Sequence, residues 1–214
     1  MSNTRRSYDL VAERYASEIG DELIGKPFDR ALLAAFAELA PAGPLLDAGC
    51  GPGHVGHYLA GGGRSVFGLD LAPAMCLQTS RRTGLPAAAA DMSELPIRSG
   101  SVAGLISMYA VIHLDDRQRA AAYREFARVL VPAGPALIAF HTSDAGAPVG
   151  SQRTLTEWWD QPVELTFRFL DPDGEVALLA DAGLQQVARL DRQPLGSEHP
   201  SQRCYLLVRK PDQA

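Results

Sequence analysis

The chain has 214 residues, of which 46% are hydrophobic and 21% are charged, and its formal net charge is −5. This length and composition are typical of one globular domain, so we expect a single soluble domain over residues 1–214. The acidic balance and the scattered arginines argue against a nucleic acid or an anionic membrane as the main partner, and they favour a small molecule.

The sequence predicts neither a membrane span nor a secretory signal, because no apolar run approaches the roughly 20 residues that cross a bilayer. We therefore expect a cytoplasmic protein, as a monomer or a homodimer. The three cysteines, Cys50, Cys76 and Cys204, are widely spaced and offer neither a disulfide framework nor a C-x-x-C motif. Since only Lys26 and Lys210 carry a side-chain amine, lysine-nucleophile chemistry has almost no candidates.

Two helices are predicted before any strand, over residues 7–21 and 28–39, so we interpret residues 1–42 as an N-terminal helical cap. From Pro44 onward, apolar runs alternate with amphipathic ones, which is typical of an open parallel sheet covered by helices on both faces. The predicted strands cover residues 45–47, 65–71, 87–90, 103–109 and 136–141, and the helices between them cover residues 54–60, 73–83 and 116–130.

Residues 143–173 break this alternation. They begin with the turn-rich AGAPVG and continue with TEWWDQPVELTFRF, which is too irregular to predict one element. We expect an insertion here that contributes to a substrate pocket. After it, residues 173–182 are predicted as a helix, and the alternating segments 185–191 and 203–209 as a hairpin-linked pair that closes the sheet.

The stretch LLDAGCGPGHVG, residues 45–56, contains a glycine turn that fits two classes of cofactor. Gly51, Gly53 and Gly56 spell the G-x-G-x-x-G of a dinucleotide-binding turn, and Asp70 follows about twenty residues later, as that motif requires. Such a turn places a pyrophosphate at the N-terminus of the following helix. A nicotinamide-dependent reductase is therefore one hypothesis, although no tyrosine is followed four residues later by a lysine, as in short-chain reductases.

Asp47 and Gly49 extend the same pattern upstream to D-x-G-x-G. A buried carboxylate beside the turn would repel a pyrophosphate, and it would attract a ligand that carries an ammonium group. S-adenosylmethionine is such a ligand, because it has an ammonium, a sulfonium, a ribose and an adenine but no phosphate. The charge of Asp47 thus favours this second cofactor.

Two further acids follow the next two predicted strands. Asp70 ends the second strand and can accept both ribose hydroxyls, and Asp91 ends the third and can accept the adenine amine, with Met92 packing on the ring. Each acid alone would equally fit a helix or turn cap. Together with Asp47, however, they border one crevice at the carboxyl edge of the sheet, where open α/β sheets bind ligands.

At this point the sequence resembles a known family. LLDAGCGPG, VFGLDLAPAM, AADMSELPIRSGSVAGLIS and REFARVLVPAGPALIAF are similar to the class I S-adenosylmethionine-dependent methyltransferases, particularly the small single-domain ones that act on small molecules. The resemblance covers about residues 8–209. It implies a Rossmann-like, doubly wound sheet of seven strands in the order 3-2-1-4-5-7-6, with the last-numbered strand antiparallel, and S-adenosylhomocysteine as product. The implied cofactor contacts are Asp47, Gly49, Cys50, Gly51, Gly53, Asp70, Leu71, Met75, Asp91 and Met92.

Three tyrosines are additional candidates for cofactor contact. The N-terminal YDLVAERY is similar to a segment that folds over the cofactor in many family members, which points to Tyr8 and Tyr15. Their i, i+7 spacing describes a packed helix face equally well. Tyr109, where the fourth strand meets the cofactor, either flanks the transferred methyl group or packs in the core.

Two histidines are candidates for catalysis. Methyl transfer from a sulfonium can rely on positioning and desolvation, but an acceptor that must lose a proton gains roughly 10² to 10⁴ from a positioned base. His113 follows the fourth predicted strand and His141 closes the fifth; a family histidine near His113 is often structural. We assign no metal, since His54 and His57 have no third ligand in the sequence.

The aromatic residues of the insertion are the last group of candidates. Trp158, Trp159, Phe167 and Phe169 fit either an acceptor pocket or ordinary core packing. The same motifs would also serve a protein that binds the cofactor without transferring its methyl group, such as a cyclase or a regulator. That alternative stays open on the sequence alone.

Overall fold

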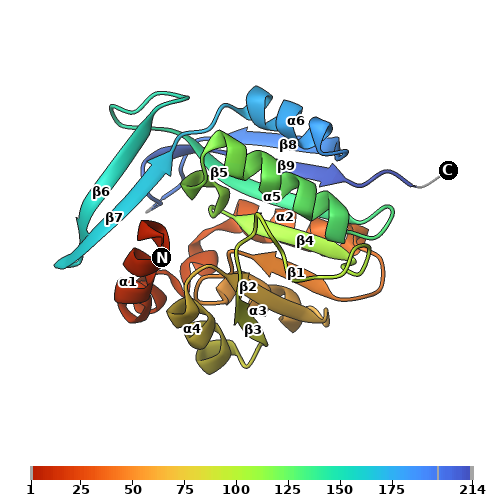
Figure 1. Ribbon diagram of the computed structural model, residues 1–214, viewed down its shortest axis with the longest axis horizontal. Coiled ribbons are helices and arrows are strands. Elements are labelled where there is room, and N and C mark those ends of the chain that lie inside the picture. Colours follow the sequence, from red (N-terminus) through yellow and green to blue (C-terminus); the bar gives the residue numbers. More distant parts are fainter. Residues whose placement is uncertain (1, 197, 213–214) are drawn as a thin grey trace.

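The computed structural model describes residues 2–196 and 198–212, and its centre is a seven-stranded sheet (Figure 1). The strand order is β3-β2-β1-β4-β5-β9-β8, and β9 runs antiparallel to both β5 and β8 while the other pairs are parallel. This confirms the predicted order. The strands are β1 (Leu45–Ala48), β2 (Val66–Asp70), β3 (Ala87–Ala89), β4 (Gly104–Met108), β5 (Pro135–Asp144), β8 (Gln185–Arg192) and β9 (Ser201–Arg209).

Helices cover both faces of the sheet because alternate residues of its central strands point to opposite sides. On β1, Leu46 belongs to one core with Phe126 of α5, whereas Leu45 belongs to a second core with Phe36 of α2. All four side chains are fully buried. The helices of the domain are α2 (Pro27–Leu39), α3 (His54–Gly61), α4 (Pro73–Thr83), α5 (Asp116–Val129) and α6 (Pro172–Asp181).

The N-terminal part of the chain divides between two places. Helix α2 packs on a face of the sheet, while α1 (Asn3–Ile19) lies against α4 and a separate hairpin, and the short 3-10 segment η1 (Glu22–Gly25) connects them. Three consecutive residues attach α1 to three different elements. Ser7 Oγ accepts from the Glu164 amide at 2.8 Å, Tyr8 Oη bonds to His113, and Asp9 Oδ1 accepts from the Ala74 amide at 3.0 Å.

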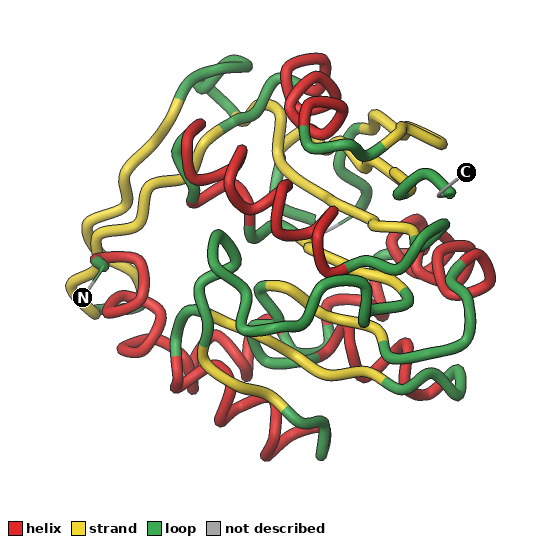
Figure 2. The backbone as a smooth tube through the Cα atoms, turned by 45° about the vertical axis from the view of Figure 1, so that its right-hand side comes forward, coloured by secondary structure: helices red, strands yellow, loops and turns green. Residues whose placement is uncertain are grey.

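Residues 143–173, where the sequence pattern was too irregular to predict one element, contain two strands. Strands β6 (Gln152–Trp158) and β7 (Gln161–Arg168) form an antiparallel hairpin of their own, which stands apart from the main sheet and extends toward the N-terminal helix (Figure 2). Its turn residues Trp159 and Asp160 have φ angles of 52° and 60°. Tight hairpin turns need positive φ at both central residues and are usually signalled by Asn-Gly. Because Trp159 and Asp160 stand at these two positions instead, the turn could not be recognised from the sequence.

No helix in the described ranges has both the length and the apolar character needed to cross a membrane.

Candidate active site

A cavity of about 160 Å³ lies at the carboxyl ends of β1 to β4, covered on one side by α1. Its wall follows the sheet order. Gly49 and Gly51 come after β1, Asp70 is the last residue of β2, Asp91 comes after β3 and Tyr109 comes after β4. The predicted cofactor contacts that line it are Gly49, Gly51, Asp70, Leu71, Met75, Asp91, Met92, Tyr8, Tyr15 and Tyr109, and His113 lines it too.

The glycine turn lines part of the cavity with backbone atoms that carry no side chain. Gly49 and Gly53 both have φ +83°, a left-handed conformation that favours glycine. A Cβ on Gly49 would lie 2.3 Å from the Ala110 Cβ, and one on Gly53 would lie 2.6 Å from Thr79 Cγ2. Gly53 therefore serves the packing of α3 on α4, and Gly49 the close approach of the turn to the next loop.

Asp70 is held by the turn that it faces. Its Oδ2 accepts a hydrogen bond from the Gly51 amide and its Oδ1 accepts one from the Ala72 amide, both at 2.9 Å. Burial raises the pKa of this carboxyl, against the opposing effect of these two hydrogen bonds. On the next strand end, Asp91 Oδ1 accepts from the amide and hydroxyl of Ser93. Two oriented carboxylates thus face one crevice.

The lining of the cavity carries acidic groups without basic partners. Within the described ranges, none of the lining residues is a lysine or an arginine, whereas Asp70 and Asp91 are both present. A pyrophosphate is normally met by backbone amides and cationic side chains, so this environment disfavours a dinucleotide. It suits a nucleoside that is phosphate-free.

Residues 45–134, which form this glycine turn and the strand ends around it, match the family model described as "Methyltransferase domain". The chain belongs to the class I S-adenosylmethionine-dependent methyltransferases. The cofactor of this family is S-adenosylmethionine, and a crevice lined by Asp70 and Asp91, with no lysine or arginine among its described lining residues, fits that molecule.

The chain is 30% identical over 158 residues to a probable S-adenosylmethionine-dependent methyltransferase of Mycobacterium tuberculosis. The matched region covers 72% of this chain and 54% of that relative. The chain is also 35% identical over 117 residues to the malonyl-[acyl-carrier protein] O-methyltransferase of Pseudescherichia vulneris, covering 54% of this chain and 45% of that relative. The chain thus spans about half the length of these relatives.

Among solved structures, it is similar to an S-adenosylmethionine-dependent methyltransferase of Methanosarcina mazei, with a TM-score of 0.72 at 15% identity. That match covers 84% of this chain and 98% of the other. At this identity the likeness shows the shared fold.

Asp47, which the sequence pattern assigned to the ligand ammonium, lies outside the described lining of the cavity. Its Oδ2 accepts from the Gly56 amide in the first turn of α3 at 3.1 Å, and it is 2% exposed. Burial raises its pKa to about 7, so it is only partly ionised at neutral pH. The structure gives Asp47 a capping position behind the turn, and its contact with the ammonium stays a prediction.

Cys50 and Gly53 also lie outside the described lining. The Cys50 sulfur approaches Thr79 Oγ1 at 3.5 Å on α4, so it faces the helix behind the turn. Their predicted cofactor contacts stay predictions, with backbone groups of the turn as the available contacts.

His113 joins the cavity wall to two neighbouring elements. Its Nδ1 lies 3.0 Å from the Thr166 carbonyl oxygen, which can only accept, so Nδ1 carries the proton and Nε2 accepts from Tyr8 Oη at 2.7 Å. Burial lowers the pKa of His113 to about 4. The ring is therefore neutral at pH 7 with both nitrogens engaged, and a catalytic role for it stays a prediction.

His141, the second catalytic candidate, is separated from the cavity by Tyr109. The two rings stack with centroids 4.8 Å apart and an interplanar angle of 23°. Its Nδ1 lies 2.8 Å from Ser201 Oγ, and burial lowers its pKa to about 3. His141 lies outside the described lining, where its ring contacts the lining residue Tyr109, and its catalytic role stays a prediction.

Tyr109 is held by a buried polar network that the sequence did not indicate. Its φ is +57°, an unusual value for a non-glycine residue that costs on the order of 1–3 kcal/mol. Its hydroxyl lies 2.6 Å from that of Tyr205 and 3.4 Å from Asp29 Oδ2. Asp29, 1% exposed, also accepts from Arg192 at 3.0 Å. These partners come from α2, β8 and β9, so only the sheet topology brings them together.

The aromatic residues of the hairpin pack against α1 above the cavity. Trp158 and Trp159 stack with centroids 4.5 Å apart, and Tyr15 contacts Trp158 edge-to-face. Phe167 contacts His113 at 4.8 Å, whereas Phe169 is a buried core residue. The hairpin aromatics therefore pack against the α1 tyrosines that line the cavity, and a role of the hairpin in an acceptor pocket stays a prediction.

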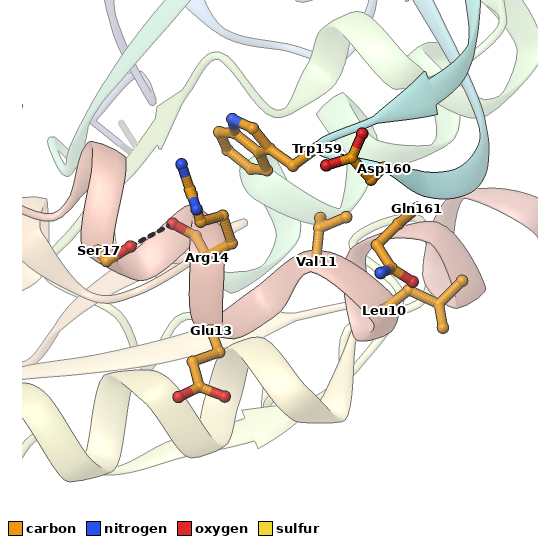
Figure 3. Close-up of a pocket in the computed structure, with 8 residues that line it drawn as sticks. All are labelled: Leu10, Val11, Glu13, Arg14, Ser17, Trp159, Asp160 and Gln161. Atoms are coloured by element: carbon orange, nitrogen blue, oxygen red, sulfur yellow. Dashed lines mark hydrogen bonds between the residues drawn. The ribbon is translucent and has the colours of Figure 1, made fainter.

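A second hollow lies on the other flank of α1. This open groove of about 490 Å³ runs between Arg14 of α1 and Trp159 of the hairpin turn (Figure 3). It contains neither the glycine turn nor the strand-end acids, so we place the active site in the crevice. In the described part of the chain, no cluster of His, Cys, Asp or Glu side chains could hold a metal ion.

Proposed function

We propose that this chain transfers a methyl group from S-adenosylmethionine to a small-molecule acceptor by in-line displacement. The observation that carries the proposal is that Asp70 and Asp91 line one crevice next to the bare glycine turn. The Asp70 carboxylate would accept from the ribose hydroxyls, and Asp91 from the adenine amine with Met92 against the ring. When bound, the cofactor supplies a methyl group activated by a positively charged sulfur.

The contribution of the chain itself is orientation and exclusion of water. Tyr8 and Tyr15 border the cavity from α1, and both contact Trp158 of the hairpin edge-to-face. The aromatic rings of Tyr8 and Tyr15 make this side of the cavity apolar. A displacement that releases a neutral thioether gains most from such positioning and desolvation.

We also propose an acceptor whose nucleophilic atom has a free lone pair at neutral pH, such as a carboxylate. The two candidate bases support this choice, because the pKa of His113 is lowered to about 4 and that of His141 to about 3. Bases this weak remove a hydroxyl proton poorly. The similarity to a malonyl O-methyltransferase supports an oxygen nucleophile.

The test is a product balance. The purified protein is incubated with S-adenosylmethionine and a panel of small carboxylic acids, and both products are measured by mass spectrometry. We expect S-adenosylhomocysteine and methylated acceptor in equal amounts. An acceptor that is transformed without S-adenosylhomocysteine would instead show a cyclase-type use of the fold, and failure of the folded protein to bind S-adenosylhomocysteine would overturn the cofactor assignment.

A further inference from the structure

Glu22 and Lys26 form a largely buried ion pair beside the active site. Glu22 begins η1 and Lys26 directly precedes α2, and Lys26 Nζ lies 2.8 Å from Glu22 Oε2. Their side chains are 24% and 11% exposed. The other carboxylate oxygen of Glu22 lies 3.2 Å from Nε2 of His54, the first residue of α3. A buried pair of this kind rarely stabilises a fold more than apolar packing does.

The strand order tells which part of the cofactor lies near this pair. Along the edge of the sheet, Asp91 follows β3, Asp70 ends β2, the glycine turn follows β1 and Tyr109 follows β4. With the adenine at Asp91 and the ribose at Asp70, the amino-acid end of the cofactor falls between the turn and Tyr109.

The ion pair lies next to two residues that line this end of the cavity. Lys26 Nζ lies 5.0 Å from the centroid of the Tyr109 ring. On the other side, Glu22 is close enough to Tyr15 to affect its pKa: burial raises this pKa most, and the negative charge of Glu22 raises it further. The Tyr15 ring lies beside Gly51 of the glycine turn. The pair therefore sits between two tyrosines that line the cavity.

The charges of the pair match those of an α-amino acid. Burial opposes ionisation of Glu22, but the hydrogen bond from His54 and the charge of Lys26 lower its pKa to about 2. Glu22 is thus a full anion at neutral pH, in contrast to Asp47 with its pKa of about 7. An ammonium needs such an anion and a carboxylate needs a cation, and both stand here within one turn of chain.

We propose that Glu22 and Lys26 form the subsite for the amino-acid end of the cofactor, with Glu22 receiving the ammonium and Lys26 the carboxylate. This inference rests on the proposed function for the identity of the cofactor. It gives the ammonium contact to Glu22 in place of Asp47.

The test compares three ligands by calorimetry: S-adenosylhomocysteine, its analogue without the amino group and its analogue without the carboxylate. We expect Glu22→Gln to weaken S-adenosylhomocysteine binding about ten- to a hundredfold, the effect of losing one charged hydrogen bond. The same variant should bind the analogue without the amino group as tightly as the wild type does. Lys26→Met should show the corresponding pattern with the analogue that lacks the carboxylate.

Two matched controls are available. Glu18→Gln makes the same change in the exposed Arg14–Glu18 pair of α1, whose side chains are 62% and 45% exposed. Lys210→Met removes the only other lysine of the sequence, which bonds to the Leu130 carbonyl away from the cavity. Both controls should bind all three ligands like the wild type.

Exchanging the two charges separates an effect on ligand binding from an effect on folding. The double variant Glu22→Lys/Lys26→Glu keeps an ion pair at this place but reverses its direction, so we expect a folded protein with strongly weakened S-adenosylhomocysteine binding. Near-wild-type affinity of this variant would overturn the subsite, as would equal losses for all three ligands in Glu22→Gln. A folded wild type that binds none of the three would instead overturn the proposed function.

Discussion

Tyr8 of α1 donates a hydrogen bond to Nε2 of His113, at 2.7 Å and across 105 residues of sequence. Through Nδ1, the same imidazole donates to the Thr166 carbonyl of β7. One neutral ring therefore connects the covering helix, the loop after β4 and the hairpin, and this arrangement depends on the ring staying neutral.

The first prediction concerns the pH dependence of stability. The pKa of His113 is about 4 in the folded protein and 6.5 without the fold. The unfolded state therefore binds more protons, so the contribution of His113 to stability is fully present above pH 6.5 and is lost as the pH drops toward 4. We expect this residue to account for about 3 kcal/mol of that loss. His113→Gln should show a shallower loss in urea titrations between pH 7 and pH 4, although His141 still contributes in the same direction. An unchanged pH profile would contradict the assigned protonation state.

The second prediction tests the ribose contact. Asp70→Asn keeps an oxygen that can accept from the Gly51 amide but removes the negative charge toward the ligand. We expect S-adenosylhomocysteine affinity, measured by calorimetry, to fall at least about tenfold, as for a charged hydrogen bond. Asp181→Asn, at an exposed position that ends α6, is the control and should bind normally. Equal affinity of the two variants would remove Asp70 from the site.

The third prediction separates Asp47 from ligand binding. Its raised pKa of about 7 means that the folded state holds a proton that the unfolded state releases above pH 3.8. Wild-type stability therefore declines as the pH rises from about 4 to 7 through this group, and the cost persists above pH 7. Asp47→Asn should remove the cost, with a higher urea midpoint at pH 8 and a similar one at pH 4. Its S-adenosylhomocysteine affinity should stay within about twofold of wild type, whereas a large loss would restore Asp47 as the ammonium partner.

The fourth prediction concerns the hairpin turn. Asp160 has φ +60°, which glycine adopts without strain. Asp160→Gly should stabilise the protein by about 0.5–1 kcal/mol, measured by chemical denaturation, because it relieves the left-handed strain at this position. Gly146→Ala, at φ +74° in the loop before β6, is the opposite change and should destabilise.

Local patterns in the sequence were sufficient for the alternation of strands and helices and for much of the crevice, whereas the order of the strands came from the resemblance to the methyltransferase family. The run LLDAG and the acids at the ends of β2 and β3 each depend on neighbours in sequence, so they could be recognised. The network around Asp29, Tyr205 and Arg192 could not, since its members meet only after β9 inserts beside β5. The same holds for Glu22 and Lys26, whose i, i+4 spacing is ordinary until the fold places it beside Tyr109.

The attachment of α1 through Ser7, Tyr8 and Asp9 has a kinetic consequence. These three residues bond to β7, η2 (Val111–His113) and α4. Since they are consecutive in one helix, one bond cannot open far while the other two hold. We expect α1 to move away from the cavity only when all three bonds break together, and the escape of S-adenosylhomocysteine, instead of the chemical step, to limit turnover.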